Sequence, residues 1–309
     1  MKLVSVIIPC YNDAETLSRA IESVTRQTYS AIEIIVVNDC SLKTQLIEIC
    51  LAKYPQVRYV KNSFNVGLAA TRNNGLVIAN GELIAFLDAD DEYHPDKIAR
   101  QVIALDDAEV ITCGLVNLYP NGQVVKNIRS IRTFKSVGRL IYRNTLNGAG
   151  LLAPKRLLLE HGGYDVTLRS CEDYDLWLRL LSAGIKVKDI GEPLYLYHFN
   201  LLGLSKNIIN ISKWELEVIK RHAARMGLSW SKSYHYASAV LVRLLCHLLR
   251  GETAKNEELR RQTILNISLL EGFPLIQIFC RLVAKNRLMS IPAYFLGLLN
   301  RFTWQVAKN

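Results

Sequence analysis

The strongest constraint on the fold is an alternation, within the first 110 residues, of short apolar segments with longer amphipathic ones. The apolar runs are continuous and rich in β-branched residues, as buried parallel strands require. They are Leu3–Ile8, Ile34–Val37, Val57–Val60 and Leu83–Leu87. The segments between them have helix-compatible sequence and are Ala14–Thr28, Thr44–Tyr54 and Leu68–Ala79. This spacing predicts an α/β domain whose mostly parallel sheet has helices on both faces.

Polar turns follow three of these predicted strands. They are Pro9–Asn12, Asn38–Ser41 and Asp88–Asp91. In open α/β sheets ligands bind outside the carboxyl ends of the strands. We therefore expect the three turns to share one rim of the sheet and to form the binding site.

Beyond residue 110 the pattern changes. Val110–Tyr119 and Gln123–Ile128 flank a Pro-Asn-Gly turn, which predicts a hairpin. Pro154 opens a short helix that Gly162 and the following glycine end. A further helix is predicted over about Glu172–Ala183, and from about residue 205 the sequence indicates successive helices.

Charge also divides the chain in two. The net charge is +10, and residues 211–309 hold 15 Lys/Arg against 6 Asp/Glu, whereas residues 1–210 hold 23 against 22. We therefore expect a near-neutral domain over residues 1–205, followed by a basic helical region over residues 206–309.

Cysteine usage and hydropathy bear on the compartment. The seven cysteines are scattered and form no CxxC pair, which is typical of reduced thiols in a cytosolic protein. The first residues lack the long apolar region of a signal peptide. The longest apolar stretches fall short of the roughly 20 residues that span a bilayer. The sequence therefore predicts a cytoplasmic protein that does not cross a membrane.

The acidic run Asp88-Ala89-Asp90-Asp91 is the first candidate for chemistry. Three carboxylates that follow a buried strand repel one another, and a divalent cation such as Mg²⁺ or Mn²⁺ would relieve that repulsion. Such an ion can bridge the phosphates of a nucleotide-sugar. The alternative is a solvated loop whose last Asp caps the next helix. The chain has neither GxxxxGK[ST] nor GxGxxG after a strand, which argues against a kinase, an ATPase or a dinucleotide dehydrogenase.

Taken in order, the segments along this rim resemble the family 2 glycosyltransferases, which are inverting enzymes of the GT-A fold. The resemblance covers most of residues 3–200 and does not extend to the last hundred residues. The matching stretches are VSVIIPCYNDAETLSRAIESVTRQTY, IEIIVVND, NVGLAATRNNGL, GELIAFLDADDEYHPDKI and GGYDVTLRSCEDYDLWLRLLSAG. It implies that residues 1–205 form a catalytic domain that binds a nucleotide-sugar.

The resemblance implies that four residues contact the nucleotide. Pro9 and Tyr11 lie where the family packs a nucleobase. Asp39 lies where a carboxylate accepts a hydrogen bond from the uracil ring nitrogen, which implies a UDP-linked donor, and Arg72 matches an arginine near the nucleotide. Without the family context, Tyr11 would be ordinary packing and Arg72 would pair with a surface carboxylate. Cys40 stands where the family often has glycine, and a positive φ there would cost energy.

The same resemblance assigns the catalytic groups. Asp88 would bind the ribose, Asp90 the metal, and Asp173 matches the family's proposed general base. Local sequence gives Asp173 an alternative, because Ser170 and Asp173 also fit a capping box with Ser170 as the N-cap. His198 is a weak counterpart of a histidine that some members place near the metal, and a structural role is its alternative.

These assignments imply a single inverting displacement. The general base takes a proton from the acceptor hydroxyl as that oxygen attacks the anomeric carbon, while the cation stabilises the leaving diphosphate. The family often builds surface polysaccharides or extends lipid-linked sugars, so the implied partners are a nucleotide-sugar donor and a glycan or lipid-linked acceptor. The competing hypotheses are a nucleotidyltransferase, which also uses acidic metal ligands, and a non-catalytic scaffold.

The basic region adds a hypothesis about location. Ser212–Leu228 and Tyr234–Leu249 combine basic residues with apolar ones such as Leu216 and Ile219, as helices that lie on an anionic membrane surface do. The alternative is that the apolar faces pack on the catalytic domain and the basic residues are solvated. No nucleic-acid motif accompanies the charge, so we expect no nucleic-acid partner. The expected location is cytoplasmic, peripheral on the inner face of the cytoplasmic membrane.

Overall fold

The computed structural model describes residues 1–106, 109–200 and 208–228, together with residues 236, 239–240 and 243. Two compact units are present. The first comprises Met1–Ser136 and Leu146–Gly203, and the second comprises Val137–Thr145 and Leu204–Asn309. Each is described separately below, and the expected division at residue 205 stays a prediction.

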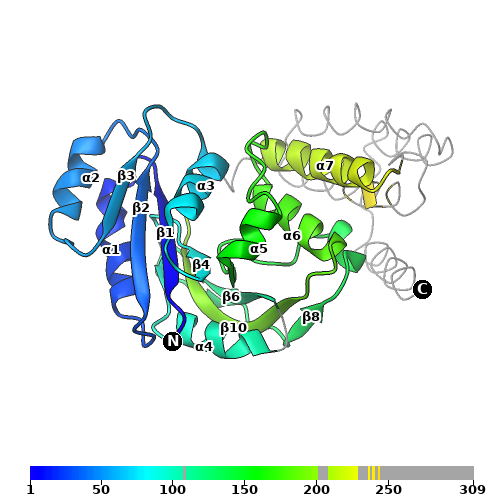
Figure 1. Ribbon diagram of the computed structural model, residues 1–309, viewed down its shortest axis with the longest axis horizontal. Coiled ribbons are helices and arrows are strands. Elements are labelled where there is room, and N and C mark those ends of the chain that lie inside the picture. Colours follow the sequence, from blue (N-terminus) through cyan, green and yellow to red (C-terminus); the bar gives the residue numbers. More distant parts are fainter. Residues whose placement is uncertain (107–108, 201–207, 229–235, 237–238, 241–242, 244–309) are drawn as a thin grey trace. The chain divides into compact units, whose positions relative to one another are not determined.

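The amino-terminal half of the first unit alternates strands and helices, as the hydropathy pattern predicts (Figure 1). The elements are β1 (Val4–Cys10), α1 (Ala14–Thr25), β2 (Ile32–Asn38), α2 (Thr44–Leu51), β3 (Arg58–Lys61), α3 (Leu68–Ile78) and β4 (Leu83–Phe86). Each predicted strand and helix in this half is present, with its ends shifted by a few residues.

The second half of the unit is less regular. Its elements are β5 (Glu92–Tyr93), α4 (Lys97–Ile103), β6 (Val110–Leu118), β7 (Val124–Lys126), β8 (Arg132–Phe134), β9 (Leu152–Pro154), α5 (Lys155–Glu160), α6 (Glu172–Ser182) and β10 (Val187–His198). The predicted hairpin is confirmed by the antiparallel pairing of β6 with β7. Pro154 is the N-cap of α5, and Gly162 and Gly163 follow its end with positive φ angles.

The strands form one sheet in the order β3-β2-β1-β4-β9-β6-β10-β5. In addition, β7 pairs with β6 and β8 pairs with β10. The strands β3, β2, β1 and β4 are parallel, as are β6 and β10. The strand β9 lies antiparallel between β4 and β6, so the sheet is mixed. The strand β9 therefore joins the parallel strands β3, β2, β1 and β4 to the second parallel pair, β6 and β10.

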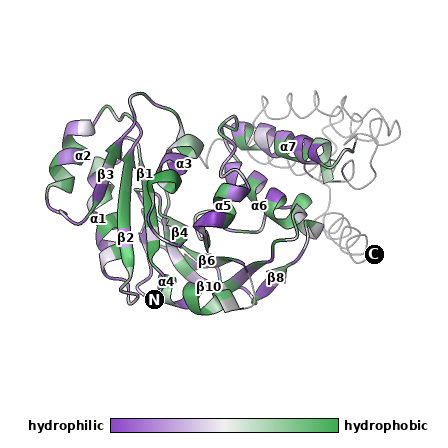
Figure 2. Cartoon of the chain, viewed as in Figure 1, coloured by the Kyte–Doolittle hydropathy of each residue, from purple (hydrophilic) through white to green (hydrophobic). Residues whose placement is uncertain are grey.

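Alternate residues of β1 face opposite sides of the sheet. Val6 and Ile8 belong to the apolar core that includes Leu17 and Ile21 of α1. On the other face, a Cβ at Gly75 of α3 would meet the side chain of Ile7, so this glycine allows α3 to lie close against β1. Helices therefore cover both faces, which explains why β1 and β2 are hydrophobic along most of their length (Figure 2).

In the second unit the main described element is α7 (Ile208–Arg225). Its residues Leu216, Val218 and Ile219 are buried, whereas Lys213 and Arg225 are exposed. Among the described helices none is long and apolar enough to span a membrane.

Candidate active site

Two of the three predicted turns are joined at the carboxyl ends of β1 and β2. The N–H of Asp39 donates to the carbonyl oxygen of Cys10 (2.9 Å), and the N–H of Asn12 donates to Oγ of Ser41 (3.0 Å). Asn12 and Cys40 have φ angles of 65° and 55°. The sequence indicated that a positive φ at Cys40 would be costly, and the chain does adopt this strained conformation.

Asp39 is buried and held by three N–H groups from the segment before α3. The N–H of Val66 and the amide of Asn62 donate to Oδ1 (2.8 and 2.9 Å), and the N–H of Gly67 donates to Oδ2 (2.8 Å). An ionised carboxylate offers about four acceptor positions, so one position on Oδ2 is left for a further donor. Asp39 is therefore both a structural anchor for the loop and a candidate contact for a nucleobase N–H.

The two residues expected beside the nucleobase differ in exposure. Pro9 is buried within β1, where it is paired in register with Val37. Tyr11 follows the strand and is 45% exposed. Only the Tyr11 ring is therefore accessible to a ligand without rearrangement, and it is an aromatic surface on which a base can stack.

Arg72 of α3 connects the acidic turn to α6. Its guanidinium donates to Asp88 Oδ1 (2.8 Å) and to Glu172 Oε1 (2.7 Å), and it lies over the ring of Tyr164 at 5.3 Å from the ring centre. Burial lowers the pKa of Arg72, but the two carboxylates outweigh burial and raise it above its ordinary value. Arg72 is thus a buried, permanent cation that fixes two acidic residues, 84 positions apart in the sequence, at one place.

The three carboxylates of the acidic turn have different environments. Asp91 is buried, and it accepts hydrogen bonds from the hydroxyl of Tyr195 (2.8 Å) and the N–H of His198 (2.7 Å). Burial, followed by the charges of Asp88 and Asp90, raises the pKa of Asp91 to about 8. It therefore links β4 to β10 and does not cap a helix, so the capping alternative was wrong.

Asp90 is a partly buried carboxylate with two like charges near it. Partial burial, followed by the negative charges of Asp88 and Asp13, raises the pKa of Asp90 to about 6. Burial and the charge of Asp88 also raise the pKa of Asp13, which lies at the start of α1. Asp13 was not among the predicted site residues, although it directly follows the predicted turn Pro9–Asn12.

These carboxylates suit a hard divalent cation in chemical type. Mg²⁺ and Mn²⁺ prefer oxygen ligands, which carboxylates provide, and either ion would relieve the repulsion between these carboxylates. Over the part of the chain that the structure describes, however, no three His, Cys, Asp or Glu side chains already have metal-binding geometry.

Asp173 lies in the first turn of α6, beside Glu172 and therefore beside the Arg72 bridge. The N-cap of α6 is Cys171, which has a φ of 62° and makes no side-chain capping bond. The predicted capping box with Ser170 as N-cap was therefore wrong. Burial and the charge of Glu172 raise the pKa of Asp173 to about 6. A carboxyl group with this pKa is ionised near neutrality and still basic enough to take a proton.

His198 ends β10 and contacts Glu92 and Asp91. Its Nε2 lies 2.8 Å from Glu92 Oε1, and its backbone N–H binds Asp91. These contacts support the structural alternative that the sequence analysis preferred.

The sequence analysis also missed Glu172 as the partner of Arg72, Tyr195 as the partner of Asp91, and Gly148, whose Cα faces the carboxyl group of Asp173. The adjacent acidic pair Glu172-Asp173 in the sequence could have indicated Glu172 as a site residue. The other two depend on tertiary contacts that leave no local pattern.

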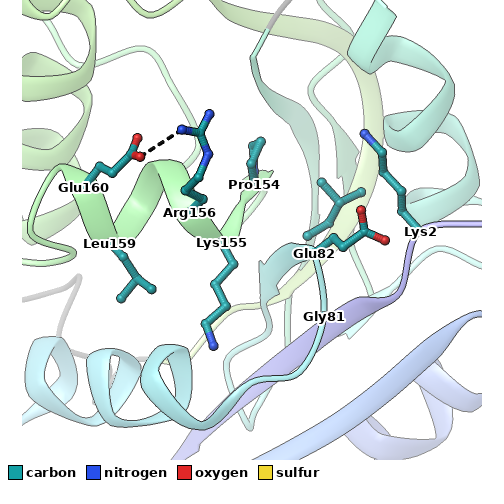
Figure 3. A pocket seen from close by; sticks show the side chains of 9 residues that line it. Lys2, Gly81, Glu82, Pro154, Lys155, Arg156, Leu159 and Glu160 are labelled. Atoms are coloured by element: carbon teal, nitrogen blue, oxygen red, sulfur yellow. Dashed lines mark hydrogen bonds and ion pairs between the residues drawn. The ribbon is translucent and has the colours of Figure 1, made fainter.

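A cavity of about 520 Å³ lies elsewhere (Figure 3). It is bordered by Lys2 before β1, by Glu82 before β4 and by Lys155 and Arg156 of α5, so it is at the amino ends of the strands. The ammonium group of Lys155 donates to the carbonyl oxygens of Val77 and Ala79 at the end of α3 (3.2 and 2.6 Å), which is a structural capping role. None of the predicted site residues borders this cavity.

Comparison with known proteins agrees with this geometry. The sequence profile described as Glycosyl transferase family 2 matches residues 5–156. The Escherichia coli UDP-Glc:alpha-D-GlcNAc-diphosphoundecaprenol beta-1,3-glucosyltransferase WfaP is 33% identical over 210 residues, which are 67% of this chain and 82% of the relative. An uncharacterised glycosyltransferase of Haemophilus influenzae is 30% identical over 233 residues, 71% of this chain and 76% of the relative.

Among solved structures, S. aureus TarS 1–349 in complex with UDP-GlcNAc has a TM-score of 0.66 and 20% identity, covering 87% of this chain and 80% of that one. This likeness confirms the GT-A fold expected for the first unit. The matching family profile and the sequence relatives show that the chain is a glycosyltransferase and belongs to glycosyl transferase family 2.

Proposed function

We propose that this glycosyltransferase moves a sugar from a UDP-linked donor to an acceptor hydroxyl in one inverting displacement that depends on a divalent cation. The observation that supports this most is the bridge of Arg72 between Asp88 and Glu172. It brings the acidic turn, where a diphosphate would bind, next to the helix that begins with the proposed base.

The donor would occupy the carboxyl ends of β1, β2 and β4. The Tyr11 ring would stack on the uracil, and the remaining acceptor position of Asp39 would take the uracil N–H. Asp88 would bind the ribose with the oxygen that Arg72 leaves open, so Arg72 would orient Asp88 rather than touch the nucleotide itself. The UDP-linked donors of the E. coli and S. aureus proteins support this choice of nucleotide.

Asp90 would hold the Mg²⁺ or Mn²⁺ ion, with the donor phosphates completing its coordination. When bound, the cation would neutralise the charge that develops on the departing nucleoside diphosphate. The raised pKa of Asp90 supports this assignment, because a carboxylate repelled by Asp88 and Asp13 gains more from a cation than an isolated one.

Asp173 would act as the general base. Its carboxylate would accept the acceptor's proton while the acceptor oxygen forms a bond to the anomeric carbon and the bond to the diphosphate breaks. Attack from the face opposite the leaving group inverts the configuration, so an α-linked donor gives a β-linked product. The pKa of about 6 leaves Asp173 ionised at neutral pH.

The acceptor would be a lipid-linked or surface glycan, since the E. coli relative acts on a diphosphoundecaprenol-linked sugar. An acceptor of this kind would bring the enzyme to an anionic membrane surface. Leu216, Ile219 and Arg243 cannot contribute to that surface as expected, because all three are buried and Arg243 is paired with Glu215 (2.5 Å). The exposed basic residues of α7 are Lys213 and Arg225, Lys220 and Arg221 are half-buried, and most of Tyr234–Leu249 lies outside the described residues.

A panel of nucleotide-sugars, each with Mg²⁺, Mn²⁺ or EDTA, tests the proposal through thermal stabilisation and slow donor hydrolysis. We expect UDP-sugars to raise the melting temperature only when a cation is present. Stabilisation by a nucleotide-sugar with another base, or equal stabilisation in EDTA, would contradict the donor or the metal assignment, respectively.

A further inference from the structure

We propose that Gly148 is a positioning residue: by having no side chain, it provides the space in which the carboxyl group of Asp173 is held. The inference rests on the proposed function only in taking Asp173 as the base. It assigns the segment Asn147-Gly148-Ala149-Gly150, called here the 147–150 loop, a role that Glu172 and Arg72 do not fill.

The contact is between Gly148 and the whole side chain of Asp173. A Cβ added at Gly148 would overlap Asp173 Oδ2 and Cβ and would lie 2.7 Å from its Cγ. Because the overlap includes the Asp173 Cβ, rotation of the carboxyl group alone would not remove it. Gly148 is not among the glycines with positive φ, so the backbone would tolerate alanine and space alone requires glycine here.

The 147–150 loop is anchored to the sheet on the side away from Asp173. Oγ1 of Thr112 in β6 donates to the carbonyl oxygen of Asn147 (2.7 Å), and the Asn147 amide donates to the carbonyl oxygen of Cys113 (3.3 Å). A Cβ at Gly150 would lie 2.7 Å from the Asn147 amide nitrogen. The loop therefore cannot retreat toward β6 without breaking these contacts.

A buried pair on α4 provides a further anchor. The side-chain amide of Gln101 donates to the carbonyl oxygen of Gly150 (2.6 Å) and accepts from the ammonium group of Lys97 (2.8 Å). Lys97 is fully buried and lies over the Tyr93 ring, 4.0 Å from its centre. Because Lys97 can only donate, it sets the Gln101 amide so that its NH₂ faces Gly150. Gln101 is thus a second positioning residue, which acts through the loop.

These contacts have two consequences for Asp173. Its carboxyl group packs against Gly148, and its Oδ1 accepts a hydrogen bond from the N–H of Tyr174 (2.7 Å). It is also shielded from water on the Gly148 side, and burial is the main cause of its raised pKa. A base must be held to within a fraction of an ångström, since a displacement of about 1 Å can cost on the order of 100-fold in rate.

The test replaces Gly148 by alanine in the full-length enzyme. We expect kcat to fall by about 100-fold while the KM for the donor stays within about two-fold, because the donor side of the site is untouched. We also expect the acidic midpoint of the pH–kcat profile to move below that of the wild type, since a displaced Asp173 is better solvated. A purely structural glycine would lower the melting temperature without shifting that midpoint.

Gly184→Ala is the matched control. Gly184 has a φ of +81° and no atom within 4 Å of an added Cβ, so the exchange introduces backbone strain without touching Asp173. We expect a lower melting temperature and an unchanged kcat for the folded fraction.

Gln101→Glu provides an independent test in case Gly148→Ala does not fold. Glutamate keeps an acceptor for Lys97 but cannot donate to Gly150, so the loop loses that anchor while Lys97 stays paired. We expect kcat to fall by about 10-fold with the same downward shift of the pH midpoint. A wild-type kcat and midpoint in a folded Gly148→Ala or Gln101→Glu protein would overturn the inference. If Asp173→Asn is fully active, the proposed base is wrong; if it is inactive while both loop variants behave as wild type, only the positioning role fails.

Discussion

The guanidinium of Arg72 lies 2.8 Å from the carboxylate of Asp88 and, with its other terminal nitrogen, 2.7 Å from Glu172. The Arg72 side chain is only 7% exposed, so water does not screen either pair well. The acidic turn after β4 and the first turn of α6 are therefore fixed relative to each other before any substrate binds. The predictions below follow from this arrangement and from its neighbours.

Replacing Arg72 by methionine should destabilise the protein strongly. Removal of one partner from a fully buried ion pair typically costs about 3–5 kcal/mol, and the loss here should lie at the lower end because Asp88 is 32% exposed while Glu172 is 13% exposed. Arg72→Lys should recover only part of this loss, since a single ammonium group does not match two carboxylates as the planar fork does. Denaturant unfolding of the three proteins measures the difference, and equal stability of wild type and Arg72→Met would contradict it.

Replacing Asp90 by alanine should abolish the effect of Mg²⁺ or Mn²⁺ on activity and on donor binding while the protein stays folded. Because the pKa of Asp90 is higher in the folded protein than in the unfolded chain, ionisation of Asp90 lowers the free energy of unfolding. This destabilisation is complete above a pH of about 6 and absent below the ordinary pKa of an aspartate. Without metal, Asp90→Ala should therefore melt higher than wild type at pH 8, and the gap should narrow toward pH 4. Activity in Asp90→Ala that EDTA still removes would rule out the metal role.

Replacing Asp173 by asparagine should lower turnover by about 10²–10⁴-fold, the usual contribution of general base catalysis. Donor affinity, measured by calorimetry, should stay near that of wild type. Asp173 Oδ1 accepts a hydrogen bond from the N–H of Tyr174 (2.7 Å), and asparagine keeps an acceptor oxygen for it, so the melting temperature should be nearly unchanged. Turnover close to wild type would exclude Asp173 as the base.

The pH dependence of the wild-type enzyme should report the same group. A base works only when it is ionised, so kcat should fall as the pH drops below about 6, where Asp173 becomes protonated. The Asp173→Asn protein should lack this dependence in its residual rate. A wild-type profile that stays flat down to pH 5 would show that another group accepts the proton.

Charge reversal tests the membrane hypothesis at the exposed positions of α7. Lys213→Glu with Arg225→Glu should weaken sedimentation with anionic vesicles, because each basic group near such a surface contributes about 1 kcal/mol. Neutral vesicles and high salt are the controls, and both should abolish binding of the wild type. Binding that is insensitive to salt and to these substitutions would show that the basic face of α7 does not contact the membrane.

Local pattern predicted the elements and the rim well, since a buried parallel strand and an amphipathic helix have distinct periods. Local pattern was less informative where contacts between residues far apart in the sequence determine the conformation or the partner of a side chain. Local sequence favoured Ser170 as a helix cap, but Cys171 adopts a left-handed conformation and takes the N-cap position. Local sequence also could not show that Arg72 bridges Asp88 and Glu172, since the two carboxylates are 84 positions apart. The space at Gly148 is set by a helix 24 residues further along the chain, so no neighbouring residue could reveal it.

The antiparallel strand β9 has a consequence for the order of folding. It pairs with β4 and β6, so Leu152 meets Ala85 and Ile111, which precede it by 67 and 41 residues. The Tyr195 hydroxyl that holds Asp91 comes later still, on β10. Contacts of such long sequence separation form late, because the chain must first lose the entropy of closing large loops. During synthesis, the nucleotide side of the site can therefore take shape while the ribosome is still adding the residues that will complete the acceptor side. A nascent chain that stops short of β10 would have all the acidic residues of the rim but would lack the partner that fixes Asp91.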